Sequence, residues 1–194
     1  MTELRLKAVI DACVLFQASV RDTLLRAAEA ELYEVYWSEI ILDEISRNLL
    51  KTGTMKQKQV QRLLAALRQF FPKAMVKGFE YLIPEMRNDD KDRHVLAAAV
   101  VAEAQVIVTS NLKDFPEQVL KPYEIEALSP DEFLIYLFDE APKTMMEIVT
   151  QQAAELRNPP RTVTEVLDEL VLHAPQFSAI VRSQRYSYLP SLPQ

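Results

Sequence analysis

Short apolar runs alternate with longer segments of helical periodicity over the first two thirds of the chain, and this alternation limits the fold more than any other feature. The runs are rich in β-branched and aromatic residues, which is typical of strands. We expect strands at residues 7–11, 33–37 and 106–109, with weaker ones at 74–79 and 123–127. The helices between them are expected at residues 20–32, 38–50, 55–71 and 91–104. The pattern predicts a three-layer α/β/α fold with a parallel sheet.

The periodicity changes after residue 128. From there on it is helical only, over residues 130–140, 143–157, 162–172 and 175–186, with prolines between the segments. We therefore expect a sheet domain over residues 1–128 and a C-terminal helical subdomain over 129–194, ending in a loose tail.

Composition excludes several classes of protein. With 49% hydrophobic residues and two glycines, the chain is expected to be folded and rich in helix. The single cysteine, Cys13, excludes an intramolecular disulfide and suits a reducing cytosol, so a cytoplasmic location is expected. Residues 1–7 do not resemble a signal peptide, and no apolar segment is long enough to span a bilayer, so we expect no membrane association.

Charge is unevenly distributed along the chain. The net charge of −6 argues against a nucleic-acid partner, because phosphate binding normally uses a basic surface. Residues 51–78, however, hold seven Lys or Arg and no acid, and within them Lys56, Lys58 and Arg62 are candidate RNA contacts. The alternative is that this stretch is simply a solvated helix face.

Asp11 is the most informative candidate site residue. It closes the first apolar run, where an ionised carboxylate is costly unless a donor or a cation meets it. Asp114 follows the apolar run that ends at Thr109, and Asn111 lies between the two. Because sites in parallel sheets collect at the carboxyl ends of strands, we expect these side chains at one edge.

Two further acids lie in predicted helices. Glu44 falls on the apolar arc of the helix that Ser38 caps, although it could equally be a carboxylate at the rim of the core. Asp92 shares a face with Val95 and Leu96, which should pack on the sheet, although an Asp in a first helical turn also stabilises the helix dipole. Acids from distant segments that converge in this way hold hard divalent cations.

Other chemistry has less support in the sequence. His94 lies on the opposite side of its helix from Asp92 and His173 lies in the helical region, so we interpret both as structural. Cys13 has no neighbouring base that would make it a nucleophile. A phosphatase centred on Asp11 would want a second acid two residues on, where Cys13 stands. The chain has no glycine-rich phosphate-binding loop.

Four segments together resemble the PIN domain family, with closest similarity to VapC-type toxins of bacterial toxin–antitoxin pairs. They are residues 9–15, 37–45, 92–99 and 108–116, in the family's order and spacing. The resemblance covers about residues 5–128. Residues 21–25 and 129–134 are also similar to a PIN subgroup that often carries a helical C-terminal extension.

The resemblance implies a ribonuclease that depends on Mg²⁺ or Mn²⁺. Asp11, Glu44 and Asp92 would be its core carboxylates and metal ligands, with Asp114 as a fourth catalytic acid. Many members have Thr-x-Asp where this chain has Asn111, which leaves a second metal open. Ser38 and Thr109 would support the site. Attack of a metal-bound water would leave 5′-phosphate and 3′-hydroxyl ends.

The implied setting is a toxin that cleaves RNA and is inhibited by a cognate antitoxin protein, and a homodimer is an open alternative for its assembly. Two other functions remain open. One is a housekeeping PIN ribonuclease in RNA processing, which genomic neighbourhood would distinguish from a toxin. The other is a non-catalytic PIN-fold binding module, for which Asn111 is the best support. The helices after residue 128 are expected to serve assembly or antitoxin contact.

Overall fold

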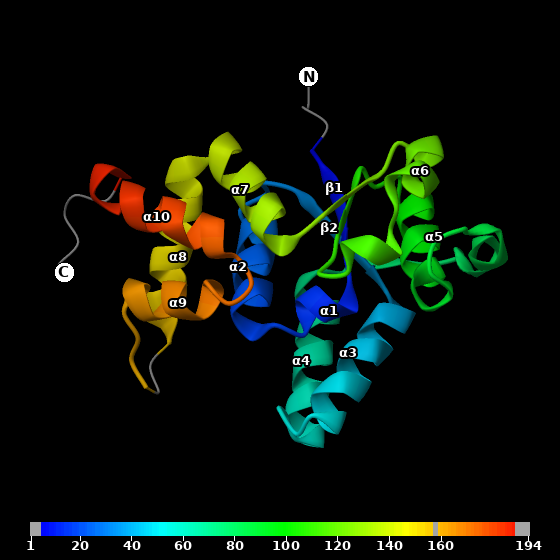
Figure 1. Ribbon diagram of the computed structural model, residues 1–194. Helices are drawn as coiled ribbons and strands as arrows, with labels where there is room; N and C mark the ends of the chain where they lie inside the picture. Colours follow the sequence, from blue (N-terminus) through cyan, green and yellow to red (C-terminus); the bar gives the residue numbers. More distant parts are fainter. Residues whose placement is uncertain (1–4, 157–158, 189–194) are drawn as a thin grey trace. The chain divides into compact units, whose positions relative to one another are not determined.

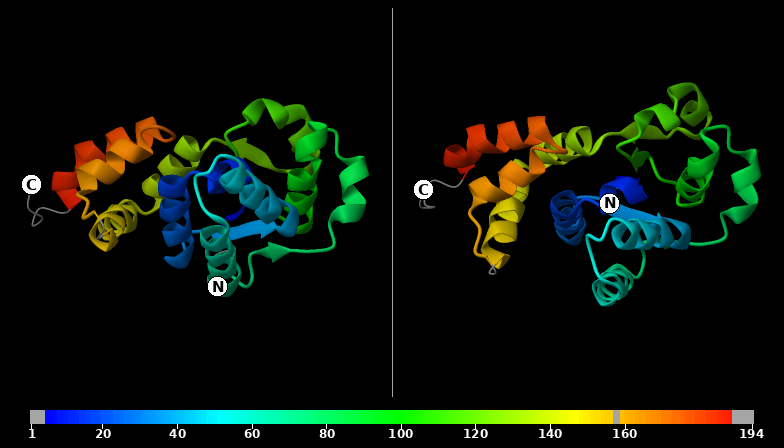
Figure 2. Two further views of the ribbon diagram at one scale, coloured as in Figure 1. Left: turned by 90° about the horizontal axis from the view of Figure 1, so that it is seen from below. Right: turned by 60° about the horizontal axis from the view of Figure 1, so that its bottom comes forward.

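The computed structural model describes residues 5–156 and 159–188, which form two compact units (Figures 1 and 2). The first unit comprises residues 1–16 and 33–129, and the second comprises residues 17–32 and 130–194. The expected tail after residue 188 lies outside the described residues. No helix in the described ranges is long and apolar enough to cross a membrane.

The first unit is built on a five-stranded parallel sheet in the order β3-β2-β1-β4-β5. Its strands are β1 (Lys7–Ile10), β2 (Glu34–Ser38), β3 (Met75–Val76), β4 (Val106–Val108) and β5 (Glu126–Leu128). Val9 of β1 pairs with Tyr36 of β2 and with Ile107 of β4. Ala8, Val9 and Ile10 are fully buried. This explains why β1 reads as an unbroken apolar run, because a central parallel strand is covered on both faces.

Helices connect the strands of this unit. The α-helices are α1 (Ala12–Leu15), α3 (Glu39–Lys51), α4 (Gln57–Phe70), α5 (Arg93–Val101) and α6 (Glu117–Leu120). The 3₁₀ turns are η1 (Glu80–Glu85), η2 (Asp90–Asp92), η3 (Leu112–Asp114) and η4 (Lys121–Tyr123). The expected α/β sheet fold is therefore confirmed.

The strand order reverses beside β1. The chain runs outward from β1 through β2 to β3, and then crosses back to β4. Because such crossovers are right-handed, α3 and α4 cover one face of the sheet while α5 and α6 cover the other. Figure 1 shows α5 and α6 beside each other, apart from α3 and α4. The crevice at the carboxyl ends of β1 and β4 is the topological switch point, where ligands bind in folds of this class.

Two expected elements of this unit are shorter in the structure. The strand expected at 74–79 spans only Met75–Val76, because Gly78 has a φ of +73° and turns the chain away. The helix expected from residue 91 begins at Arg93, after the 3₁₀ turn η2. The Asp89 carboxylate accepts a hydrogen bond from the Lys91 backbone N–H at 3.2 Å, which holds this turn tight.

The second unit is helical. Its helices are α2 (Ala18–Glu29), α7 (Pro130–Glu140), α8 (Pro142–Glu155), α9 (Val163–Leu170) and α10 (Pro175–Tyr188). Its C-terminal helices begin at Pro130, and α2, from the N-terminal part of the chain, belongs to the same unit. The domain bounds expected from the sequence, 1–128 and 129–194, stay a prediction. The Thr23 hydroxyl donates to Gln152 Oε1 at 2.8 Å, and Arg26 pairs with Glu155 at 2.7 Å, which joins α2 to α8.

Candidate functional site

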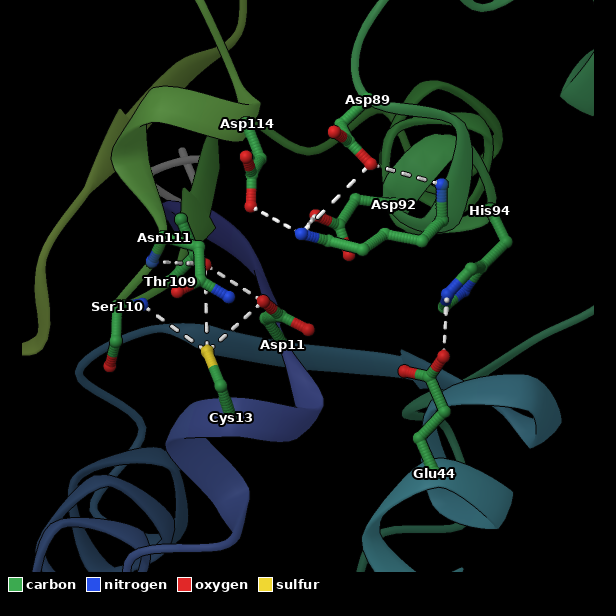
Figure 3. A network of polar contacts seen from close by, with 11 residues as sticks. Asp11, Cys13, Glu44, Asp89, Asp92, His94, Thr109, Ser110, Asn111 and Asp114 are labelled. Carbon is green, nitrogen blue, oxygen red and sulfur yellow. Dashed lines mark hydrogen bonds and ion pairs between the residues drawn. The ribbon is translucent and has the colours of Figure 1, made fainter. Parts of the chain in front are cut away.

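Asp11 lies in the crevice beside β1 and is 3% exposed. Its backbone N–H donates to the Val108 carbonyl at 3.0 Å, which continues the pairing of β1 with β4 one residue past the strand. Its Oδ2 accepts hydrogen bonds from Thr109 Oγ1 at 2.7 Å and from Cys13 Sγ at 3.1 Å (Figure 3). The buried carboxylate is therefore held in one orientation by two donors.

Thr109 and Cys13 are in turn fixed by the turn that follows β4. The Asn111 backbone N–H donates to Thr109 Oγ1 at 3.0 Å, and the Ser110 N–H donates to Cys13 Sγ at 3.3 Å. Burial, reinforced by the charge of Asp11, raises the pKa of the Cys13 thiol to about 12. The thiol therefore stays protonated and serves as a donor to Asp11, in agreement with the expectation that it is not a nucleophile.

Asp92 is 8% exposed and precedes α5. Burial raises the pKa of its carboxyl to about 6, with further contributions from the negative charges of Asp11 and Asp114. Burial and the nearby negative charges therefore both disfavour ionisation of Asp92. Its Oδ2 is buried and accepts no hydrogen bond from any described residue.

Asp114 lies in η3 and is 7% exposed. It accepts a hydrogen bond from Lys91 Nζ at 2.9 Å, and this contact holds the pKa of the Asp114 carboxyl below its usual range. The same ammonium lies 3.8 Å from Asp92 Oδ2 and 4.0 Å from Asp89 Oδ1. Lys91 therefore sits among three carboxylates.

Glu44 is placed differently from the other acids. Its Oε1 lies 3.2 Å from His94 Nε2, and Arg47 lies 3.9 Å away (Figure 3). His94 is 7% exposed, so this contact is mostly shielded from water. No hydrogen bond or ion pair links Glu44 to Asp11, Asp92 or Asp114 in the described part of the chain.

Two family models of known proteins match parts of this chain. The family model of the PIN domain matches residues 7–113, which is more than half of the chain. The chain belongs to the PIN domain family. A second model, the VapC50 C-terminal domain, matches residues 130–183.

A curated relative carries the same name as the second model. It is "Putative ribonuclease VapC50" from Mycobacterium tuberculosis (strain ATCC 25618 / H37Rv), to which this chain is 45% identical over 109 residues. The match covers 56% of this chain and 64% of the relative, so it spans less than two thirds of that protein. The PIN domain match and the described sheet coincide over β1 to β4.

The acids of this PIN domain have the right chemistry for a hard divalent cation, but they do not form a compact ligand set. Among the described residues, no three His, Cys, Asp or Glu side chains lie close enough to hold a metal ion. Carboxylate oxygens are nevertheless the donors that Mg²⁺ prefers, and it binds through one or two of them while keeping several waters. Two features fit a cation position: Asp92 Oδ2 accepts no hydrogen bond from a described residue, and the Lys91 ammonium already lies among the acids.

Buried polar atoms without a hydrogen-bond partner are concentrated in one segment of the PIN domain. Among the described residues they include both amide atoms of Asn88, Asp92 Oδ2, Arg93 Nε and His94 Nδ1. Asn88 is only 4% exposed. Such groups are rare in folded proteins, because a buried polar atom without a partner costs free energy.

The three supporting residues have clear local roles. Ser38 is fully buried and caps α3, since its Oγ accepts a hydrogen bond from the Ile41 N–H at 3.3 Å. Thr109 orients Asp11, and Asn111 contributes its backbone N–H to Thr109. Asn111 is thus tied to the site through its main chain.

The basic candidates lie on the helix after α3. Lys58 and Arg62 are exposed residues of α4, and Lys56 is the exposed N-cap of that helix. Arg68, further along α4, pairs with Glu39 of α3. The sequence alone did not predict the roles of Lys91, Asp89 and His94 at the acidic site. In the sequence, the role of Lys91 is indicated only by the acids that flank it on both sides within residues 89–92.

Proposed function

We propose that this PIN domain protein is a divalent-metal-dependent endoribonuclease and the toxin of a VapC-type toxin–antitoxin pair. The observation that carries the proposal is the burial of three acids near the strand ends where the sheet order reverses: Asp11 follows β1, Asp114 follows β4, and Asp92 shares the ammonium of Lys91 with Asp114. The printed name of the M. tuberculosis relative supports RNA as the substrate.

Asp11, Asp92 and Asp114 would hold Mg²⁺ or Mn²⁺, with Glu44 joining them once it leaves His94. When bound, the cation lowers the pKa of an attacking water and neutralises charge that develops on the phosphate. Thr109 and Cys13 keep Asp11 Oδ2 fixed, so that this carboxylate needs little reorganisation. Hydrolysis would leave 5′-phosphate and 3′-hydroxyl ends.

A cleavage assay on structured RNAs, with and without Mn²⁺, tests this function. We expect the Asp11→Asn variant to lose at least about 100-fold in rate, because removing even a group that supports a metal ligand lowers activity 10–100-fold. Asp43→Asn is the matched control, since Asp43 is exposed on α3 beside Glu44. Equal cleavage by wild type and Asp11→Asn would exclude the proposed centre, and no cleavage by wild type would favour a binding module.

We further propose that α4 guides RNA toward the acids through Lys56, Lys58 and Arg62. Replacing Lys58 and Arg62 by Glu should weaken RNA binding and reduce its salt slope by about 1.4, since each contact with a single strand contributes about 0.7. Lys121→Glu with Lys143→Glu applies the same charge change at two exposed positions elsewhere. If the salt dependence of RNA binding were unchanged in the α4 variant, these basic residues would be a solvated helix face with no role in RNA binding.

The partner is proposed to be a cognate antitoxin, encoded by a small neighbouring gene for a DNA-binding protein, and the setting is proposed to be the cytoplasm. Co-expression with that gene product tests the pairing: we expect a stable complex in which RNA cleavage is inhibited. If no such neighbour exists, a housekeeping ribonuclease becomes the better hypothesis.

A further inference from the structure

The ammonium of Lys91 occupies the centre of the acidic site. Its Nζ lies 2.9 Å from Asp114 Oδ2, 3.8 Å from Asp92 Oδ2 and 4.0 Å from Asp89 Oδ1. Asp92 and Asp114 are buried, so an excess of negative charge between them would be costly without a cation. Lys91 supplies that cation from within the chain.

Lys91 cannot act as a ligand for a metal in this state. A protonated lysine has three donors and no acceptor lone pair, so it offers nothing to coordinate a cation. A divalent ion placed between the same carboxylates would also repel the ammonium. The two cations therefore exclude each other.

The side chain of Lys91 is free enough to leave. It is 60% exposed, whereas the side chains of Asp92 and Asp114 are 11% and 8% exposed. Its backbone is held by Asp89 through the 3₁₀ turn, so the movement needs only new side-chain rotamers. The acids stay in place while the ammonium moves into water.

We propose that Lys91 is a built-in counter-cation that competes with the divalent metal: it neutralises the metal-free site and must swing out before a metal ion binds. The proposal rests on the proposed function, because it concerns the same acids. It makes Lys91 a residue that sets how much divalent cation the protein needs, although Lys91 itself never contacts the metal.

The test is Mn²⁺ binding by calorimetry, together with the melting temperature in EDTA. Lys91→Met should bind Mn²⁺ about tenfold more tightly than wild type, since a hydrogen bond to a charged group no longer has to be broken. Without metal, Lys91→Met should melt at a lower temperature than wild type. Mn²⁺ should then raise the melting temperature of Lys91→Met by more than it raises that of wild type. Lys91→Arg, which keeps the charge, should remain within about threefold of wild-type affinity.

Lys113→Met is the matched control. Lys113 is exposed, lies next to Asp114 in the chain and carries the same charge, but makes none of the three contacts of Lys91. It should change Mn²⁺ affinity less than threefold. A Lys91→Met protein that binds Mn²⁺ with wild-type or weaker affinity would overturn the proposal.

Asp92→Asn separates this inference from the proposed function. If Asp92→Asn loses Mn²⁺ binding and Lys91→Met binds like wild type, the metal site stands and the counter-cation is wrong. If wild type and Asp92→Asn bind Mn²⁺ identically, the proposed metal site is wrong, and the role of Lys91 is wrong with it.

Discussion

The two units of the molecule treat buried polar groups in opposite ways. In the helical unit, Thr23 bonds to Gln152, and Asp131 accepts hydrogen bonds from the start of α10. In the sheet unit, Asn88 and Asp92 keep buried atoms that no described residue satisfies. The comparison teaches that buried polar groups join one helix to another in the helical unit, whereas in the sheet unit they gather acids around the ammonium of Lys91.

The units also differ in charge. The sheet unit has 15 Lys or Arg against 16 Asp or Glu, whereas the helical unit has 7 against 12. An excess of acid repels a polyanion, and therefore the helical unit is unsuited to RNA. The net charge of −6 is mostly a property of the helical unit, and it says little about the surface that RNA would meet.

The largest expected effect is in the helical unit. Asp131 caps α10 by accepting hydrogen bonds from Phe177 N at 2.8 Å and Gln176 N at 3.1 Å. Asp131→Ala should lower the free energy of unfolding by about 3 kcal/mol, because one buried and one partly buried backbone N–H lose a charged acceptor. Urea denaturation measures this, with Asp139→Ala as the exposed control. If Asp131→Ala also removed stabilisation by Mn²⁺, the division between the units would be wrong.

The polar link between α2 and α8 should have the next largest effect. Thr23→Val removes the donor to Gln152 Oε1 and should lower the free energy of unfolding by about 1.5 kcal/mol. Adding Gln152→Leu should cost less than the sum of the single changes, by about 1 kcal/mol, because the partners act together. Thr150→Val is the control, since that hydroxyl bonds only within its own helix. Strictly additive effects would contradict a specific link.

At the acidic site, removing a buried charge should increase the free energy of unfolding instead of lowering it. The pKa of Asp92 is raised to about 6, so without metal its ionisation destabilises the fold as pH rises from about 4 through 6. Asp92→Asn should remove this pH dependence and add about 1 kcal/mol at pH 7, allowing for solvent screening. Thermal melts in EDTA across this range measure it, with Asp43→Asn as control. If wild type and Asp92→Asn showed the same pH dependence of stability, the assignment of that dependence to Asp92 would be wrong.

The smallest effects should be equal in the two units. Glu31 at the end of α2 and Glu124 after η4 both have positive φ, at 61° and 57°. Glycine adopts this conformation without strain, although it has more freedom when unfolded. Each Glu→Gly change should therefore add about 0.5 kcal/mol to the free energy of unfolding in urea. A loss of stability at either position would show that the glutamate side chain outweighs its backbone strain.

Much of the sheet unit could be predicted because its strands are buried on both faces. The runs around Val9 and Ile107 therefore stand out as apolar over their whole length. Asp11 could be predicted for the same reason, since an acid that ends such a run needs a partner. The partner of α2 could not be predicted: helical spacing shows that it has an apolar face, but not which helices cover that face.

The details of the acidic site depended on a local conformation that periodicity does not show. The helix expected from residue 91 is replaced at its start by the 3₁₀ turn η2, and from this turn the Lys91 side chain reaches both Asp92 and Asp114. His94 was expected on the opposite side of its helix from Asp92, and its contact with Glu44 depends on how α3 and α5 approach each other.

The divided origin of the helical unit has a consequence for synthesis. Thr23 and Gln152 are 129 residues apart, and the strands β2 to β5 lie between them in the chain. At about 5–20 residues per second, α2 emerges from the ribosome on the order of 10 s before α8. During that interval its apolar face has none of its final neighbours, while the sheet can already assemble. The nascent chain therefore passes through a stage in which the apolar face of α2 has no C-terminal helix to pack against.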